Sequence, residues 1–187
     1  VIDRLERVGC DIVLENHREN AYNMVSWLLK NKPCRQVLML FGWIDSYNTR
    51  MCMEGSNQAF AEAGKPEEEI LRVVTARKID AVVDALKQFS EKIREGERPL
   101  IVAFGSDILE YVAMEIHQHY PGWIGKVDVA GFAQAETPQK LGLQCSLVVK
   151  NPEAVGITAS ELLHRKIQEE MKDTTPRIYD IKVQYRF

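Results

Sequence analysis

A strand, turn and helix signature from Pro99 to Asp107 constrains the fold more than any other feature of the chain. Its sequence, PLIVAFGSD, is a proline, five apolar residues, Gly105 and then Ser106 and Asp107, ahead of a helical pattern that starts near Ile108. A short and wholly apolar run is typical of a strand buried on both faces. Glycine permits a tight exit, and Ser or Asp favours capping of the next helix. The carboxyl end of such a strand is where open α/β sheets bind ligands.

The same unit recurs along the chain. Strands alternating with helices predict βαβ units, and hence a three-layer, Rossmann-like α/β fold with a mostly parallel sheet. A loop is expected over 133–142, and the alternating pattern of 178–187 predicts one exposed or edge strand. Asn151 is expected to cap the last helix. The predicted strands are 1–3 (as a strand end), 11–15, 36–41, 70–75, 99–104, 126–132 and 145–149, and the predicted helices are 18–29, 46–63, 79–93, 108–119 and 152–171.

Composition excludes several classes of protein. The chain has 187 residues, a formal net charge of -3 and 45% hydrophobic residues, whereas a freestanding nucleic-acid-binding protein is usually basic. Four cysteines without a CxxC pair, namely Cys10, Cys34, Cys52 and Cys145, predict reduced thiols in a cytoplasmic protein. No run approaches the ~18 apolar residues of a membrane span, so no membrane association is expected.

The common catalytic and cofactor motifs are absent from the sequence. It contains no GxGxxG, GxxxxGK[ST], GxSxG or HExxH. We therefore predict no catalytic residues, no cofactor and no metal site, and an α/β enzyme is the least favoured of the functions considered.

Polar side chains follow the predicted parallel strands and should share one rim of the sheet. An aromatic face, hydroxyls, carboxylates and a guanidinium together suit a polar small molecule. Simpler roles exist for each: Ser46 and Asp107 as helix caps, Trp43 as a core or interface residue, and Arg77 as a surface charge. The candidate ligand-binding residues at strand ends are Trp43, Asp45, Ser46, Arg77, Ser106, Asp107 and Gln134.

Five segments in order resemble one known family. They are VIDR, DIVLENHRENAYNMVSWLL, QVLMLFGWIDSYNTRMCMEGSNQAFAEAG, LIVAFGSDILEYVAMEI, and VDVAGF followed by CSLVVKNPEAVGITASELL. Together they resemble the effector-binding domain of the LacI/GalR family of transcription regulators, which is similar to periplasmic sugar-binding proteins. The resemblance covers most of the chain.

The resemblance implies a type I periplasmic-binding-protein-like fold, with two lobes joined by crossover segments and the effector between them. About 15–147 and 178–187 would form the C-terminal lobe, whereas 1–14 and about 151–172 would belong to the N-terminal lobe. The rest of that lobe and the DNA-binding head are expected upstream of Val1. The implied partners are a sugar, sugar phosphate or organic acid effector, a second copy in a homodimer, and DNA through the missing head only.

Residue by residue, the match is uneven. Asp3 and Asp107 carry over directly from the family pattern. The family's effector-binding arginine falls three residues before a helix glycine, where this chain has Cys52, and an arginine stands two residues earlier, at Arg50. The family's ligand aspartate follows a Gly-Phe pair, and at that place, after Gly131 and Phe132, this chain has Ala133-Gln134.

These departures disfavour a simple sugar and favour an acidic or phosphorylated ligand near Arg50 and Arg77, or a degenerate cleft. Other functions remain open from the sequence. The same sensor fold occurs fused to a kinase or cyclase module, and an extracytoplasmic solute-binding protein shares it.

Overall fold

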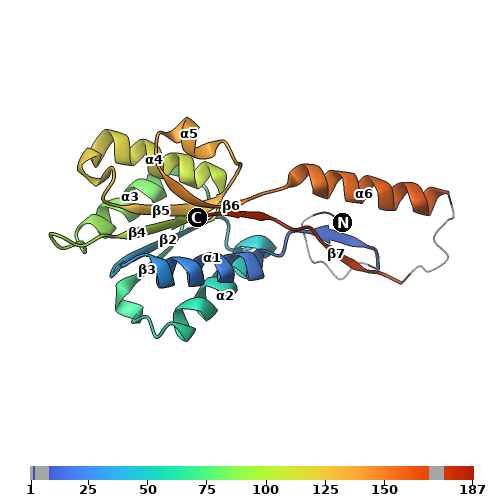
Figure 1. The fold of residues 1–187 in the computed structure, drawn as a ribbon, viewed down its shortest axis with the longest axis horizontal. Coiled ribbons are helices and arrows are strands. Elements are labelled where there is room, and N and C mark those ends of the chain that lie inside the picture. Colours follow the sequence, from blue (N-terminus) through green and yellow to red (C-terminus); the bar gives the residue numbers. More distant parts are fainter. Residues whose placement is uncertain (1, 3–8, 169–174) are drawn as a thin grey trace.

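The computed structural model of the chain describes residues 2, 9–168 and 175–187. It has a large α/β unit and a smaller extension built from α6 (Pro152–Ile167), β1 (Ile12–Leu14) and β7 (Ile178–Asp180) (Figure 1). Asp3 and most of the strand expected at 1–3 lie outside the described residues. Ile2 forms an isolated parallel bridge with Val13 of β1.

The large unit contains a six-stranded sheet in the order β3-β2-β4-β5-β6-β8. The first five strands are parallel, and β8 runs antiparallel to β6 at the edge. The apolar runs read from the sequence form β2, β4, β5 and β6, which are largely buried because helices cover both faces. The strands are β2 (Val37–Phe41), β3 (Ile70–Val74), β4 (Leu100–Ala103), β5 (Asp128–Ala133), β6 (Cys145–Val149) and β8 (Gln184–Arg186).

The sheet forms the middle of three layers, because helices cover both of its faces (Figure 1). One face carries α1 (His17–Asn31) and α2 (Tyr47–Glu62), and the other face carries three helices. Alternation along β2 shows the division, since Met39 packs in the core under α1 and α2 while Leu38 packs in the opposite core. The second layer is α3 (Ile79–Ser90), α4 (Ser106–His119) and α5 (Thr137–Leu141), and short 3₁₀ helices occur at η1 (Glu67–Glu69) and η2 (Pro121–Trp123).

The predicted fold class is thus confirmed, and the last helix begins as expected. Asn151 caps α6 by accepting a hydrogen bond from the Ala154 amide at 3.1 Å. The four cysteines are free of disulfides. In the described part of the chain, no helix is both long and apolar enough to cross a membrane.

Three local predictions were wrong. The alternating segment 178–187 is not one strand: β7 pairs in parallel with β1 in a separate two-stranded sheet, while β8 joins the large sheet. Consequently 178–180 belongs with the extension, because alternation shows exposure without specifying a partner strand. The loop expected over 133–142 contains α5, a single helical turn too short to show periodicity. The N-cap of α4 is Gly105, with Ser106 and Asp107 already inside the helix.

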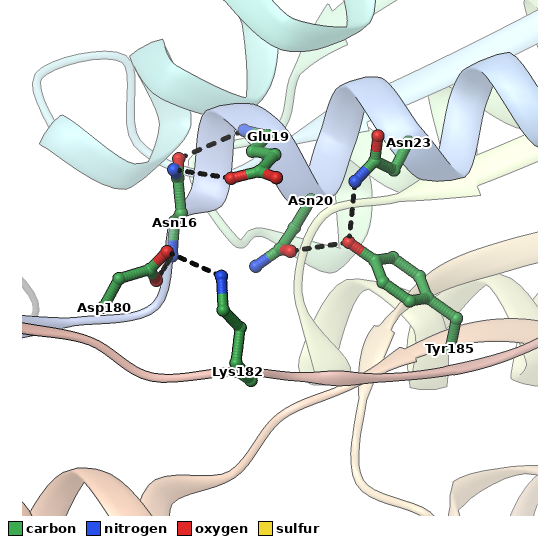
Figure 2. A network of polar contacts seen from close by, with 7 residues as sticks. All are labelled: Asn16, Glu19, Asn20, Asn23, Asp180, Lys182 and Tyr185. Atoms are coloured by element: carbon green, nitrogen blue, oxygen red, sulfur yellow. Dashed lines mark hydrogen bonds and ion pairs between the residues drawn. The ribbon is translucent and has the colours of Figure 1, made fainter.

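Three segments, here called crossings, connect the large unit to the extension: residues 15–16, 150–151 and 181–183. Polar contacts join these segments to one another and to their neighbours. The Asn151 amide donates to the buried Glu15 carboxylate at 2.6 Å, and the Ile181 amide donates to the Leu14 carbonyl at 2.8 Å. Figure 2 shows the adjoining network, in which the Asn16 amide donates to Asp180 at 3.2 Å. These contacts join segments far apart in the sequence, so they set how the extension leaves the sheet.

Tyr185 anchors the last crossing to α1 in the same network (Figure 2). Its hydroxyl donates to the buried Asn20 at 2.8 Å and accepts from Asn23 at 3.1 Å. We expect Tyr185→Phe to lower the free energy of unfolding by about 1 kcal/mol, because Asn20 loses its hydrogen-bond donor. Urea unfolding measures this. Tyr179→Phe is the matched control, since no hydrogen bond of its hydroxyl occurs among the described residues, and an equal loss there would contradict the role given to Tyr185.

Candidate functional site

The candidate site lies at the carboxyl edge of the large sheet, where the strand order reverses. The chain passes from β2 to β3 on one side and returns with β4 on the other side of β2. This makes the carboxyl ends of β2 and β4 a topological switch point, which is where doubly wound sheets bind ligands. The crossings to the extension also leave at this edge, because Lys150 directly follows β6 and His17, the first residue of α1, is separated from β1 by two residues.

Aromatic rings form the floor of a small cavity at this point, of about 60 Å³. Phe104, directly after β4, and Phe132 line the cavity, and Phe132 packs edge-on against Phe104 at 5.4 Å. Phe41 of β2 supports Phe104 from behind, with ring centroids 4.8 Å apart. The His17 ring stacks beyond Phe132 at 6.3 Å. These rings are buried, so the floor is rigid and apolar and suits one face of a planar or ring-shaped ligand.

A strained turn after β3 presents Arg77 to the cavity. Ala76 and Arg77 both adopt the left-handed backbone region, with φ of 48° and 58°, a conformation that costs non-glycine residues about 1–3 kcal/mol each. Thr75 holds the turn, because its hydroxyl donates to the Phe41 carbonyl at 2.9 Å and accepts from the Arg77 amide at 3.1 Å. Backbone strain that the surroundings enforce is typical of functional sites.

The Arg77 side chain bridges two strand ends. Its guanidinium lies 3.5 Å from the Asp107 carboxylate in the first turn of α4. A side chain at Gly42, at the end of β2, would come within 3.5 Å of the Arg77 Nε. Both members of the ion pair keep substantial exposure, so the guanidinium can exchange part of this contact for a ligand oxygen.

The structure brings together only some of the residues predicted from the strand ends. Trp43, Ser46 and Arg77 line the cavity, and Asp107 reaches it through Arg77. Trp43 is 54% exposed and therefore not a core residue. Ser46 occupies the N-cap position of α2, but its hydroxyl makes no capping hydrogen bond, which leaves it to face the cavity.

The remaining predicted residues stay apart from the cavity lining. Asp45 and Gln134 are exposed, and Ser106 is the first residue of α4 without lining the cavity. Arg50 turns away, because its guanidinium donates to the Asp45 carbonyl at 2.8 Å. Asp3 is not among the described residues. The roles of these residues in ligand binding stay predictions.

Several lining residues were not among the candidates, and three of them bear on the chemistry of the cavity. Lys150 directly follows β6 and could have been found by applying the strand-end rule to Cys145–Val149. His17 follows β1 after two polar residues, where no pattern marked it. Cys52 stands where the family resemblance places an arginine, and the structure puts it, buried, in the cavity wall.

The residues that line the cavity give it a net positive charge. Arg77 and Lys150 are permanent cations, His17 is a third basic group, and the lining formed by the described residues includes no carboxylate. Asp107 neutralises part of the Arg77 charge from beside the cavity. The site therefore offers an excess of donors and positive charge above an aromatic floor.

Comparison with known proteins addresses the fold. No protein-family model matches the chain, and no curated protein matches it. A LacI family transcriptional regulator from Enterococcus faecium, solved with bound ribose, superposes with a TM-score of 0.83 at 13% identity, covering 100% of this chain and 68% of that one.

Two further solved structures show the same fold. The Cra transcriptional dual regulator from Pseudomonas putida, in complex with fructose 1-phosphate, has a TM-score of 0.78 at 16% identity over 99% of this chain and 66% of that one. An ABC transporter solute-binding protein from Burkholderia graminis, in complex with D-arabinose, has a TM-score of 0.78 at 16% identity over 94% and 61%. The chain thus spans about two thirds of these proteins. The resemblance read from the sequence is confirmed for the fold, and the chain has the LacI and periplasmic-binding-protein-like fold.

Proposed function

We propose that the chain is the effector-sensing domain of a LacI-type transcription regulator and acts by binding rather than by catalysis. The observation that carries this proposal is the meeting of Arg77, Lys150 and His17 over an aromatic floor at the switch point of the sheet. The site faces the crossings to the extension, so a ligand held there would bias the angle between the two units. Such a bias is how a ligand selects one conformation of a hinged protein.

The ligand of this site is an acidic metabolite, in particular a sugar phosphate or an organic acid. Two cations, with no carboxylate among the described lining residues, favour an anion. Cys52 stands at the position where the family resemblance implies an arginine that binds a sugar. Solved structures of the same fold hold ribose and fructose 1-phosphate, and the second of these ligands combines a sugar ring with a phosphate.

A second lobe would complete the site. The cavity of about 60 Å³ is well below the ~300–1,000 Å³ of ordinary ligand pockets. The extension also leaves apolar surface uncovered, with Leu163 and Ile167 of α6 mostly exposed. In the proposed regulator this lobe covers both the ligand and α6, and a homodimer transmits closure to a DNA-binding head in the cytoplasm.

An extracytoplasmic solute-binding protein is the second candidate, because a D-arabinose-bound solute-binding protein superposes with the same TM-score, 0.78, as the Cra regulator. The full reading frame separates the two functions. A helix-turn-helix segment upstream of Val1 supports the regulator, whereas a secretion signal there without a DNA-binding segment contradicts it.

The ligand class is tested by a thermal-shift screen of the full-length protein with neutral sugars, sugar phosphates and organic acids. We expect one of the anionic compounds to raise the Tm in a concentration-dependent way, since saturation at 100 times the Kd stabilises a protein by about 2.7 kcal/mol. Stabilisation by neutral sugars alone would contradict an acidic ligand while leaving the sensor role in place. No stabilisation by any compound of the three classes would count against the sensor itself.

A further inference from the structure

A second concave surface lies at the opposite, amino edge of the large sheet. It is a groove of about 630 Å³ between the C-terminal end of α1, the amino ends of β5 and β6, and Phe187 beyond β8. This volume is within the ~300–1,000 Å³ of small-molecule sites. None of the cavity residues described above lines it, so the two sites are separate.

Two cations share one buried carboxylate in this groove. The Arg98 guanidinium donates to Asp128 through Nε at 2.7 Å and through Nη2 at 3.2 Å, and the Lys32 ammonium lies 3.5 Å from the same carboxylate. Asp128 neutralises only one of the two charges, which leaves an excess of one positive charge. Arg98 is 48% exposed and keeps N–H groups that Asp128 does not use, so the groove is ready to accept an anion.

The lining of the groove also includes the hydroxyl group of Ser146. Ser146 is 8% exposed, lines the groove, and makes no side-chain hydrogen bond with any described residue. It lies on the face of the sheet that carries Asp128, because it pairs with Ala130, two residues along the same strand. This hydroxyl can therefore donate a hydrogen bond to a ligand in the groove.

Two apolar side chains line the groove beside the charged groups. Ile124 and Phe187 are among the exposed large hydrophobic residues of the protein and both line the groove. Phe187 is held in place by stacking on Trp27 of α1, with ring centroids 4.4 Å apart. Burial raises the pKa of the neighbouring Cys145 thiol to about 11, so this residue adds no negative charge at neutral pH.

We propose that this groove is a second ligand site, which binds a small organic monoanion made of a carboxylate and a flat apolar body. The carboxylate of the ligand pairs with Lys32 and Arg98 and accepts a hydrogen bond from the Ser146 hydroxyl. The apolar body of the ligand packs on Phe187 and Ile124. The site stands independently of the function proposed for the opposite edge, and it would give the protein a second input from a different class of metabolite.

The test is a two-dimensional amide NMR titration of the full chain with benzoate, and with neutral benzamide as the isosteric control. Benzoate is expected to shift amides around Asp128 and 142–146 with an affinity in the millimolar range, and benzamide is expected to shift them far less. Shifts centred on Trp43 and Arg77, or equal shifts from the two compounds, would overturn the proposal.

Matched variants make the test specific to the groove. Lys32→Gln is expected to weaken benzoate binding about tenfold, because it removes the excess charge, and Ser146→Ala about threefold. Lys30→Gln makes the same change of net charge on the same helix at an exposed position outside the groove, and should leave binding unchanged. Equal weakening by the two lysine variants would mean that net charge alone attracts benzoate, and the site would be rejected.

Discussion

Replacing Gly55 with alanine is expected to lower the free energy of unfolding by about 3 kcal/mol, near the upper end of overpacking effects. A Cβ at this buried position of α2 would fall directly on the Arg18 carbonyl of α1 and lie 3.1 Å from the Tyr22 amide nitrogen. Both obstacles are backbone atoms and cannot rotate away, so the two helices must separate. Urea unfolding followed by circular dichroism measures the loss.

Gly156→Ala is the control for this experiment. Gly156 is also a helical glycine, in α6, but nothing lies within 4 Å of the Cβ that alanine would add. Alanine favours a helix over glycine by about 1 kcal/mol, so this variant should be at least as stable as the parent. A parent-like stability of Gly55→Ala would show that α1 and α2 are not in the close contact described here.

The contact at Gly55 also bears on the candidate site. His17, at the start of α1, and Cys52, one turn before Gly55, form two sides of the cavity. Separation of the helices would therefore move both walls, and a variant that still folds should bind its ligand more weakly. This links the packing of one face of the sheet to the geometry of its carboxyl edge.

Arg77→Ala is expected to weaken binding of the ligand found in the thermal-shift screen by about thirtyfold, the effect of losing a charge-assisted hydrogen bond. The free energy of unfolding should change little, because the ion pair of Arg77 with Asp107 is half exposed and such pairs contribute about 0–1 kcal/mol. Isothermal titration calorimetry gives the affinity, and urea unfolding gives the stability. An unchanged affinity would remove Arg77 from the site.

Two variants separate the roles of charge and backbone at this turn. Lys78→Ala removes the neighbouring exposed cation, which does not line the cavity, and should leave the affinity unchanged. Arg77→Gly removes the side chain and also relieves the left-handed backbone at φ 58°. It should bind the ligand as weakly as Arg77→Ala does, and it should unfold at a urea concentration equal to or higher than that of Arg77→Ala. A lower stability of Arg77→Gly than of Arg77→Ala would contradict the strain assigned to the turn.

Much of the large unit was predictable because its signals are local. The apolar runs of β2, β4, β5 and β6 are buried on both faces, and such runs are visible without knowledge of their partners. Asn151 with Pro152 marked the start of α6 in the same way, since a cap and a proline at the first position act within one turn. From these runs the carboxyl edge of a parallel sheet followed as the place of the site.

The residues that line the cavity were harder to predict, because the direction of a side chain depends on contacts with segments that are distant in the sequence. Trp43, Ser46 and Arg77 do line the cavity, but Arg50 folds back on the loop before its helix. His17 and Lys150 reach the cavity from β1 and β6, through crossings that are 133 residues apart in the sequence (150 minus 17). No spacing rule relates residues brought together by a crossover.

By itself, the sequence determined the layered α/β fold, the order of its elements along the chain and the edge of the sheet at which the candidate site lies, because short apolar runs and single turns specify burial and capping. Only the tertiary structure decided the strand order β3-β2-β4-β5-β6-β8 and the division of 178–187 between two sheets. It alone also revealed the groove at Lys32 and Arg98. The physical reason is that these features depend on which strands pair and which side chains converge, and pairing is settled by contacts between distant segments.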